Sequence, residues 1–210
     1  MRRLLYGLVI VVAIVGPLFT AGCERSATLR IVSINDGSPL RSDVVDYYMY
    51  FDKEDSSWVT IYQFMPDSVK VELQYVEIGA GLPTWTPYEA IIQQATIDFQ
   101  SKQQLPGEET PEYQKVTVPL DVSVVADATG KKTTTFYFTA VPGSWKQKVL
   151  QDYVPGDDPT SPYETDIIDL ADATLKFSGY DSVANRNVSA SAKFQIEFGN
   201  LYDDPNRFGR

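Results

Sequence analysis

Cysteine and histidine, which carry much of protein nucleophilic and metal chemistry, are almost absent from this chain. Cys23 is the only cysteine, and there is no histidine. Serine, cysteine and metal hydrolases commonly rely on histidine as a base or as a metal ligand. This composition argues against those enzyme classes, and we expect the protein not to be an enzyme.

Cys23 comes directly after a leader-like segment. Met1-Arg2-Arg3 is basic, residues 4–19 are almost wholly apolar, and Thr20-Ala21-Gly22 precedes the cysteine. A basic start, a short apolar run and small residues are typical of a secretory signal. With the cysteine in this place, the leader resembles that of bacterial lipoproteins, although Thr20 stands where leucine is usual. The resemblance implies cleavage before Cys23 and lipid on its thiol, which leaves no free thiol.

Two other interpretations of the leader are a simple cleaved signal and an uncleaved membrane anchor. The apolar run is shorter than the roughly 20 residues of a spanning helix, and Pro17 lies late in it. We therefore expect a lipid-anchored protein on the extracytoplasmic side of the cell envelope. Glu24 is not the aspartate associated with inner-membrane retention in enteric bacteria, which favours the outer membrane or cell surface.

The net charge restricts the choice of partners. The leader holds two of the 18 basic residues and none of the 28 acidic ones, so the mature chain has a formal charge of −12. Nucleic acid requires a basic surface, and so does electrostatic attachment to anionic lipid. We expect no nucleic-acid binding, membrane attachment through the N-terminal lipid, and an envelope protein as partner.

Acidic side chains gather in two loops that could hold calcium. Asp52, Glu54 and Asp55 lie in a predicted hairpin tip, and Asp157 and Asp158 lie in a long loop. Calcium takes six to eight oxygen ligands, but no EF-hand spacing is present. Solvated surface charge is the other interpretation, so we expect no cofactor beyond weakly bound calcium. A glycosidase also needs two carboxylates, but neither cluster has apolar neighbours that would raise a pKa.

Three aromatic residues could contact a partner or a ligand. Trp85 and Tyr88 lie in or beside a loop rich in glycine and proline, and Trp58 opens a predicted strand. Such rings can anchor a protein partner or stack on a sugar. They can equally cap the open end of a β-sandwich, and the sequence leaves these alternatives open.

The elements that must position these residues are mostly strands. Val69, Val71, Leu73 and Tyr75 alternate with polar residues, which is typical of a half-buried strand. The same kind of pattern predicts strands at 28–34, 44–52, 58–64, 116–124, 133–141, 173–180 and 188–198. Residues 89–100 fit a helix or a strand, and we favour a strand. One short helix is predicted over 144–153, with Trp145, Val149 and Leu150 on one face.

About nine strands separated by turns predict an all-β antiparallel sandwich. Residues 177–198 resemble the last hairpin of bacterial immunoglobulin-like domains, which implies that arrangement. The expected organisation is a signal peptide at 1–22, a short lipid-anchored tether at 23–27, a β-sandwich at 28–202 and a polar tail at 203–210.

Two functions are compatible with these observations. The first is a non-catalytic, membrane-anchored lipoprotein that acts as a structural or protein-interaction module. The second is a glycan- or calcium-binding module. An exposed tyrosine patch would favour the first, and converging carboxylates or coplanar aromatic rings would favour the second.

Overall fold

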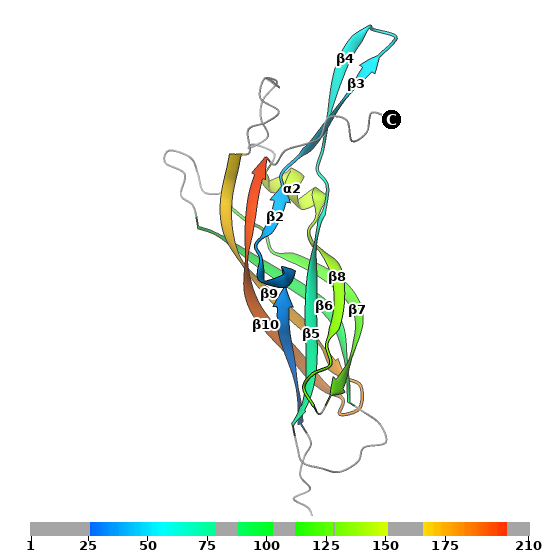
Figure 1. Ribbon diagram of the computed structural model, residues 1–210, viewed down its shortest axis with the longest axis vertical. Coiled ribbons are helices and arrows are strands. Elements are labelled where there is room, and N and C mark those ends of the chain that lie inside the picture. The colour runs from blue at the N-terminus through cyan, green and yellow to red at the C-terminus, as the bar shows by residue number, and fades with distance from the viewer. Residues whose placement is uncertain (1–25, 79–87, 103–111, 128, 151–165, 201–210) are drawn as a thin grey trace, which may run out of the picture.

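The alternating segments of the sequence form one curled sheet and a separate hairpin (Figure 1). The computed structural model describes residues 26–78, 88–102, 112–127, 129–150 and 166–200. The elements in chain order are β1 (Ser26–Ile34), η1 (Asn35–Gly37), β2 (Leu40–Asp43), β3 (Asp46–Asp52), β4 (Ser57–Gln63), β5 (Asp67–Ile78), β6 (Glu89–Ser101), β7 (Val116–Asp127), β8 (Thr134–Val141), α2 (Gly143–Leu150), β9 (Asp166–Asp181) and β10 (Arg186–Asn200). Over these described residues the prediction of an all-β fold with one short helix is confirmed.

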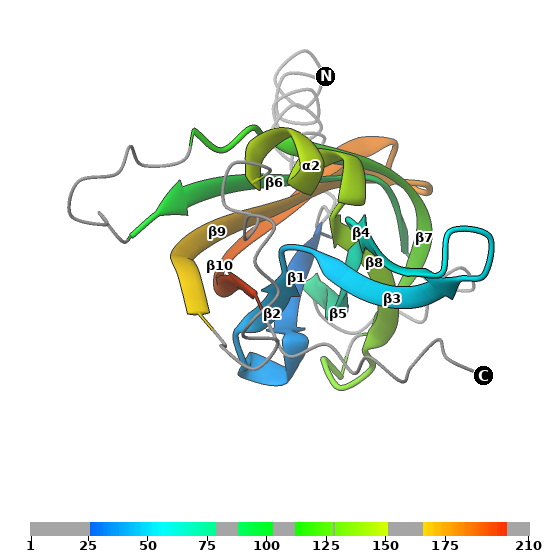
Figure 2. The same ribbon diagram turned by 90° about the horizontal axis from the view of Figure 1, so that it is seen from above.

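Eight strands form the curled sheet in the order β1-β5-β7-β6-β9-β10-β2, and β8 pairs with β5. β5 is antiparallel to β1 and β8, and two of its last residues run parallel to β7. β10 is antiparallel to β9 along its full length and parallel to β2. The sheet curls so far that β1 comes to lie beside β10 (Figure 2).

The finer prediction, an antiparallel immunoglobulin-like sandwich, is not confirmed. The β5–β7 and β2–β10 pairs are parallel, and the eight strands form one continuous curled sheet. Alternation shows which side of a strand faces the core, but it does not show which strand lies next to it. The sequence therefore predicts strands more reliably than their neighbours.

The core lies on the concave side of the curled sheet. Val69, Val71, Leu73 and Tyr75 of β5 are fully buried, as their alternation predicts. Phe194, Ile196 and Phe198 of β10 are also buried, which confirms the predicted register of this strand. The ambiguous segment 89–100 is a strand, β6, with alternate residues inside.

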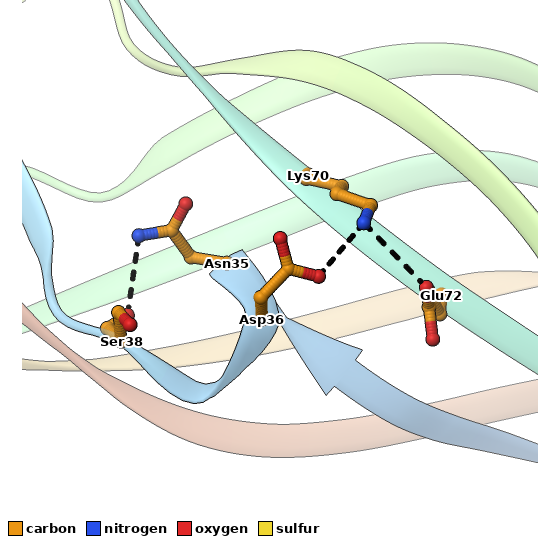
Figure 3. A network of polar contacts seen from close by, with 5 residues as sticks. All are labelled: Asn35, Asp36, Ser38, Lys70 and Glu72. Atoms are coloured by element: carbon orange, nitrogen blue, oxygen red, sulfur yellow. Dashed lines mark hydrogen bonds and ion pairs between the residues drawn. The ribbon is translucent and has the colours of Figure 1, made fainter.

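A left-handed turn carries the chain from β1 to β2. Asn35, Asp36 and Gly37 have φ angles of 49°, 53° and 80°, a region that glycine adopts freely and Asn and Asp tolerate best. The Asn35 side-chain amide donates to the Ser38 carbonyl oxygen (3.2 Å), and Lys70 Nζ donates to Asp36 Oδ1 (2.7 Å) (Figure 3). These bonds fix the turn between β1, which pairs with β5, and β2, which pairs with β10.

Candidate functional site

The hairpin of β3 and β4 projects from one end of the curled sheet (Figure 1). Within the described ranges these strands pair only with each other, from Asp46 opposite Gln63 to Asp52 opposite Ser57. A two-stranded hairpin alone is marginally stable in water, and its open edges can accept another chain. This geometry is typical of an element that a partner completes.

The end of this hairpin carries exposed aromatic rings. Tyr50, Phe51 and Trp58 are 43%, 45% and 65% exposed. Phe51 lies opposite Trp58 in the register, and their ring centroids are 5.4 Å apart in an edge-on arrangement. The two rings therefore hold each other in place while presenting apolar surface to solvent. We refer to Tyr50, Phe51 and Trp58 as the aromatic tip.

Trp58 does not cap an open end of the sheet, which was one interpretation of the sequence. Its side chain is the second most exposed of the large apolar residues that the structure describes, after Tyr137 at 68%. Large rings held in contact with water are disfavoured unless another surface covers them. For this residue the exposure fits contact with a partner or a ligand better than capping of the sheet.

The turn between β3 and β4 holds the first predicted acidic cluster. The Glu54 backbone amide donates to Asp52 Oδ1 (2.8 Å), so that carboxylate already stabilises the turn. Glu54 and Asp55 are exposed. In the part of the chain that the structure describes, no three carboxylates converge as metal ligands would. Asp157 and Asp158 lie outside the described residues, and weak calcium binding stays a prediction.

One buried lysine joins both ends of the hairpin to the helix. Lys146 of α2 is fully buried, and its Nζ donates to the Asp43 carbonyl oxygen, just before β3. The same Nζ lies 2.7 Å from Asp67 Oδ2, just after β4. Ser42 Oγ donates to that carboxylate oxygen at 2.5 Å. We call these four residues the Lys146 clamp, because they fix where the hairpin leaves the sheet.

Helix α2 reaches the clamp through a close backbone approach. A Cβ on Gly143 would lie 2.0 Å from the Phe64 carbonyl oxygen, so only glycine fits. On the other side, Trp145 stacks on Tyr113 and Phe198 with centroids 5.6 Å and 5.8 Å away. Figure 2 shows α2 lying across one end of the curled sheet. The helix is therefore fixed between the sheet and the hairpin.

The other predicted contact residues do not join this site. Tyr88 lies just before β6, half-buried against the core, and its carbonyl oxygen accepts the Ala126 amide (2.6 Å). β6 begins opposite Asp181, at the end of the molecule away from the hairpin (Figure 1). Trp58 and Tyr88 therefore do not form one surface. Trp85 and the predicted lipidation residue Cys23 lie outside the described residues.

The sequence interpretation did not identify the Lys146 clamp. A usable signal existed, because Lys146 lies four residues before Leu150 and therefore shares its helix face. Leu150 is also fully buried. A lysine on a predicted apolar face indicates a buried ion pair, but its partner Asp67 is distant in sequence and could not be inferred.

A second buried polar group lies at the opposite end of the sheet. Tyr75 Oη donates to Asp181 Oδ2 (2.5 Å), and the Val183 and Ala184 amides donate to Asp181 Oδ1 (2.9 and 2.7 Å). Burial raises the pKa of Tyr75 to about 12, and the bond to Asp181 acts in the same direction. Arg186 interacts with the same tyrosine, which raises the pKa of the arginine. This group ties β5 to the β9–β10 turn.

The raised pKa of Tyr75 predicts a loss of stability at high pH. Unfolded tyrosine loses its proton near pH 10, whereas folded Tyr75 keeps it to about pH 12. The stabilisation is therefore complete below pH 10 and is lost as pH rises towards 12. In denaturant titrations, the stability difference between wild type and Tyr75→Phe should shrink over this range. Tyr137→Phe, at an exposed tyrosine, is the control, and a constant difference would contradict the prediction.

Comparisons with protein-family models, curated proteins and solved structures found no match. A search of the described ranges for a helix long and apolar enough to cross a membrane found none.

Proposed function

We propose that this chain is a non-catalytic, membrane-anchored envelope lipoprotein that presents the β3–β4 hairpin to a protein partner. The projecting hairpin with its aromatic tip is the observation that carries the proposal. Trp and Tyr are among the side chains that most often dominate binding energy at protein interfaces, and Phe is enriched at their centres. The leader that ends at Cys23 supports the anchored, extracytoplasmic location.

The direction of the hairpin fits this location. β1 begins at Ser26, close behind Cys23 in the sequence, at the end of the sheet opposite the hairpin (Figure 1). β4 and β5 follow one another along the long axis, and at about 3.3 Å per residue they span roughly 60 Å. A lipid on Cys23 would hold β1 at the membrane and direct the aromatic tip away from it.

The chemistry of the tip favours a protein over an anionic membrane. Asp52, Glu54 and Asp55 surround one lysine, Lys53, in the turn beside the rings. Anionic headgroups would repel this acidic turn, whereas a protein can supply basic or amide groups to meet it. The alternative of a glycan-binding module has less support, because Trp58 and Tyr88 lie at different ends of the sheet.

A double substitution at the tip tests the proposed function. Phe51→Ser/Trp58→Ser should leave the melting temperature nearly unchanged, because neither ring is buried in the core. Loss of two interface anchors should weaken partner capture by at least about tenfold, since one such anchor contributes about 2 kcal/mol or more. The measurement is quantitative crosslinking and mass spectrometry of the lipidated protein in its own membranes.

Matched variants separate the parts of this proposal. Tyr137→Ser removes an exposed ring from β8 and should not affect capture. If the tip variant recovers the same partners as wild type, the hairpin is not the interface.

Cys23→Ala should leave the protein uncleaved or release it from the membrane, and unchanged fractionation and migration would rule out the lipoprotein assignment.

A further inference from the structure

The aromatic tip exposes apolar surface on both faces of the hairpin. Phe51 lies opposite Trp58 in the register, and the next pair along is Tyr50 opposite Val59. Successive residues of a strand point to opposite faces, so these two pairs lie on opposite faces of the hairpin. Phe51 and Trp58 are exposed on one face, and Tyr50 is 43% exposed on the other. Neither face of the tip is therefore a core face.

A partner with a flat surface could cover only one of these two faces. An antiparallel strand pair that packs on one side commonly keeps its second face polar. This hairpin does not follow that pattern, and Figure 1 shows it standing clear of the curled sheet. A flat partner would leave the rings of one face in water, so two walls are needed. Since a sheet and the layer packed on it lie about 10 Å apart, those walls are about 20 Å apart.

The hairpin is ordered before any partner is bound. At its base, the Lys146 clamp holds both strands to α2. At its far end, Asp52 Oδ1 accepts the Glu54 backbone amide (2.8 Å), and Ser56 closes the turn with a φ angle of 51°. An element that is already ordered loses little conformational entropy on binding. The hairpin can therefore enter a preformed site as a rigid body.

The turn that leads the hairpin is acidic. Asp52, Glu54 and Asp55 stand against one lysine, Lys53, which gives three negative charges, one positive charge and a formal charge of −2. Glu54 and Asp55 are exposed, and neither forms an ion pair within the described ranges. A carboxylate that leaves water needs a cation or hydrogen-bond donors around it. Lipid hydrocarbon offers neither, whereas basic side chains of a protein offer both.

We propose that the β3–β4 hairpin inserts into a cleft of an envelope protein, with apolar walls on both sides of the aromatic tip and basic residues at the floor. One wall contacts Phe51 and Trp58, and the other contacts Tyr50. The floor meets Glu54 and Asp55. This inference rests on the proposed function, because it adds the shape and charge of the binding site to a protein partner.

Photocrosslinking from single positions tests this arrangement in the full lipidated protein in its own membranes. A benzophenone amino acid replaces Tyr50 in one variant, Phe51 in a second and the exposed Tyr137 of β8 in a third. The first two positions face opposite walls, so both should crosslink to the same polypeptide. Tyr137 is the control and should not crosslink to it.

Neutral variants of the turn test the floor of the cleft. Glu54→Gln/Asp55→Asn should lower the crosslink yield from position 51 by at least about threefold, because it removes two ion pairs with the partner. Asp98→Asn/Asp121→Asn is the matched control. It makes the same change in charge at exposed positions of β6 and β7 and should leave the yield unchanged.

The possible results separate this inference from the proposed function. Crosslinking from only one of positions 50 and 51 would overturn the cleft and leave the hairpin as a protein interface. Crosslinking from neither position would overturn both. Adducts with lipid would assign the tip to a membrane, and adducts with a second copy would assign it to self-association, so either one overturns the inference. Equal yields from the turn variant and its control would overturn the basic floor.

Discussion

Replacement of Lys146 by methionine should lower the free energy of unfolding by about 3 kcal/mol. Removing one partner of a buried ion pair costs about 3–5 kcal/mol, because the other partner keeps an unmet charge. Asp67 is partly accessible to water at 21%, so the lower end of that range applies. The Asp43 carbonyl oxygen also loses the hydrogen bond that Lys146 donates to it. Urea denaturation at neutral pH measures the change.

The segments in which amide exchange becomes faster distinguish the Lys146 clamp from an ordinary core contact. Lys146→Met should speed amide exchange in the hairpin, residues 46–63, more than in β6 and β9, because the clamp holds both ends of the hairpin. Lys148→Met, on an exposed position of the same helix, is the matched control and should change stability by less than about 0.5 kcal/mol. Uniform exchange along the chain, or equal stability of the two variants, would contradict this role.

Replacement of Phe198 by alanine should cost about 3–5 kcal/mol of folding free energy. Phe198 is fully buried, and its ring lies 5.4 Å from Tyr113, 5.8 Å from Trp145 and 6.2 Å from Phe99. The substitution leaves a cavity among rings held by different parts of the fold, β6, α2 and the segment before β7, so they close it only in part. Since typical domains are stable by about 5–15 kcal/mol, this loss brings the fold near its limit.

Substitutions on the two faces of β10 test the register as well as the core. Phe194→Ala should also destabilise strongly, since its ring is only 8% exposed. Lys193→Ala, at the exposed position directly before Phe194 and on the opposite face of the strand, should change stability by less than about 0.5 kcal/mol. Three equal melting temperatures would show that the assigned faces of β10 are wrong.

Much of the local structure follows from short-range pattern. The alternation in 69–75 and in 194–198 predicts which side chains are buried, because successive residues of a strand point to opposite faces. The turn at 35–39 follows from residue types that tolerate positive φ, and the structure has it there. The helix at Gly143–Leu150 follows from the spacing of Trp145 and Leu150.

The candidate site depends on contacts between segments that are distant in sequence. Lys146 meets Asp67 and Asp43 only because α2 packs across the end of the sheet, and no spacing rule connects these positions. The separation of Trp58 from Tyr88 has the same origin. Closeness in sequence groups acidic and aromatic residues by loop. The fold instead places a residue beside its partner on the neighbouring strand, as it places Phe51 opposite Trp58.

The sequence by itself determined the all-β class, the faces of the main strands and the turn at 35–39. These features depend on local geometry, in which each residue type limits its own backbone and its nearest neighbours. Only the tertiary structure decided the strand order, the free hairpin, the Lys146 clamp and the closeness of β1 to β10. Strand order depends on which edges meet after the chain closes long loops, and the alternating pattern is equally compatible with many such pairings.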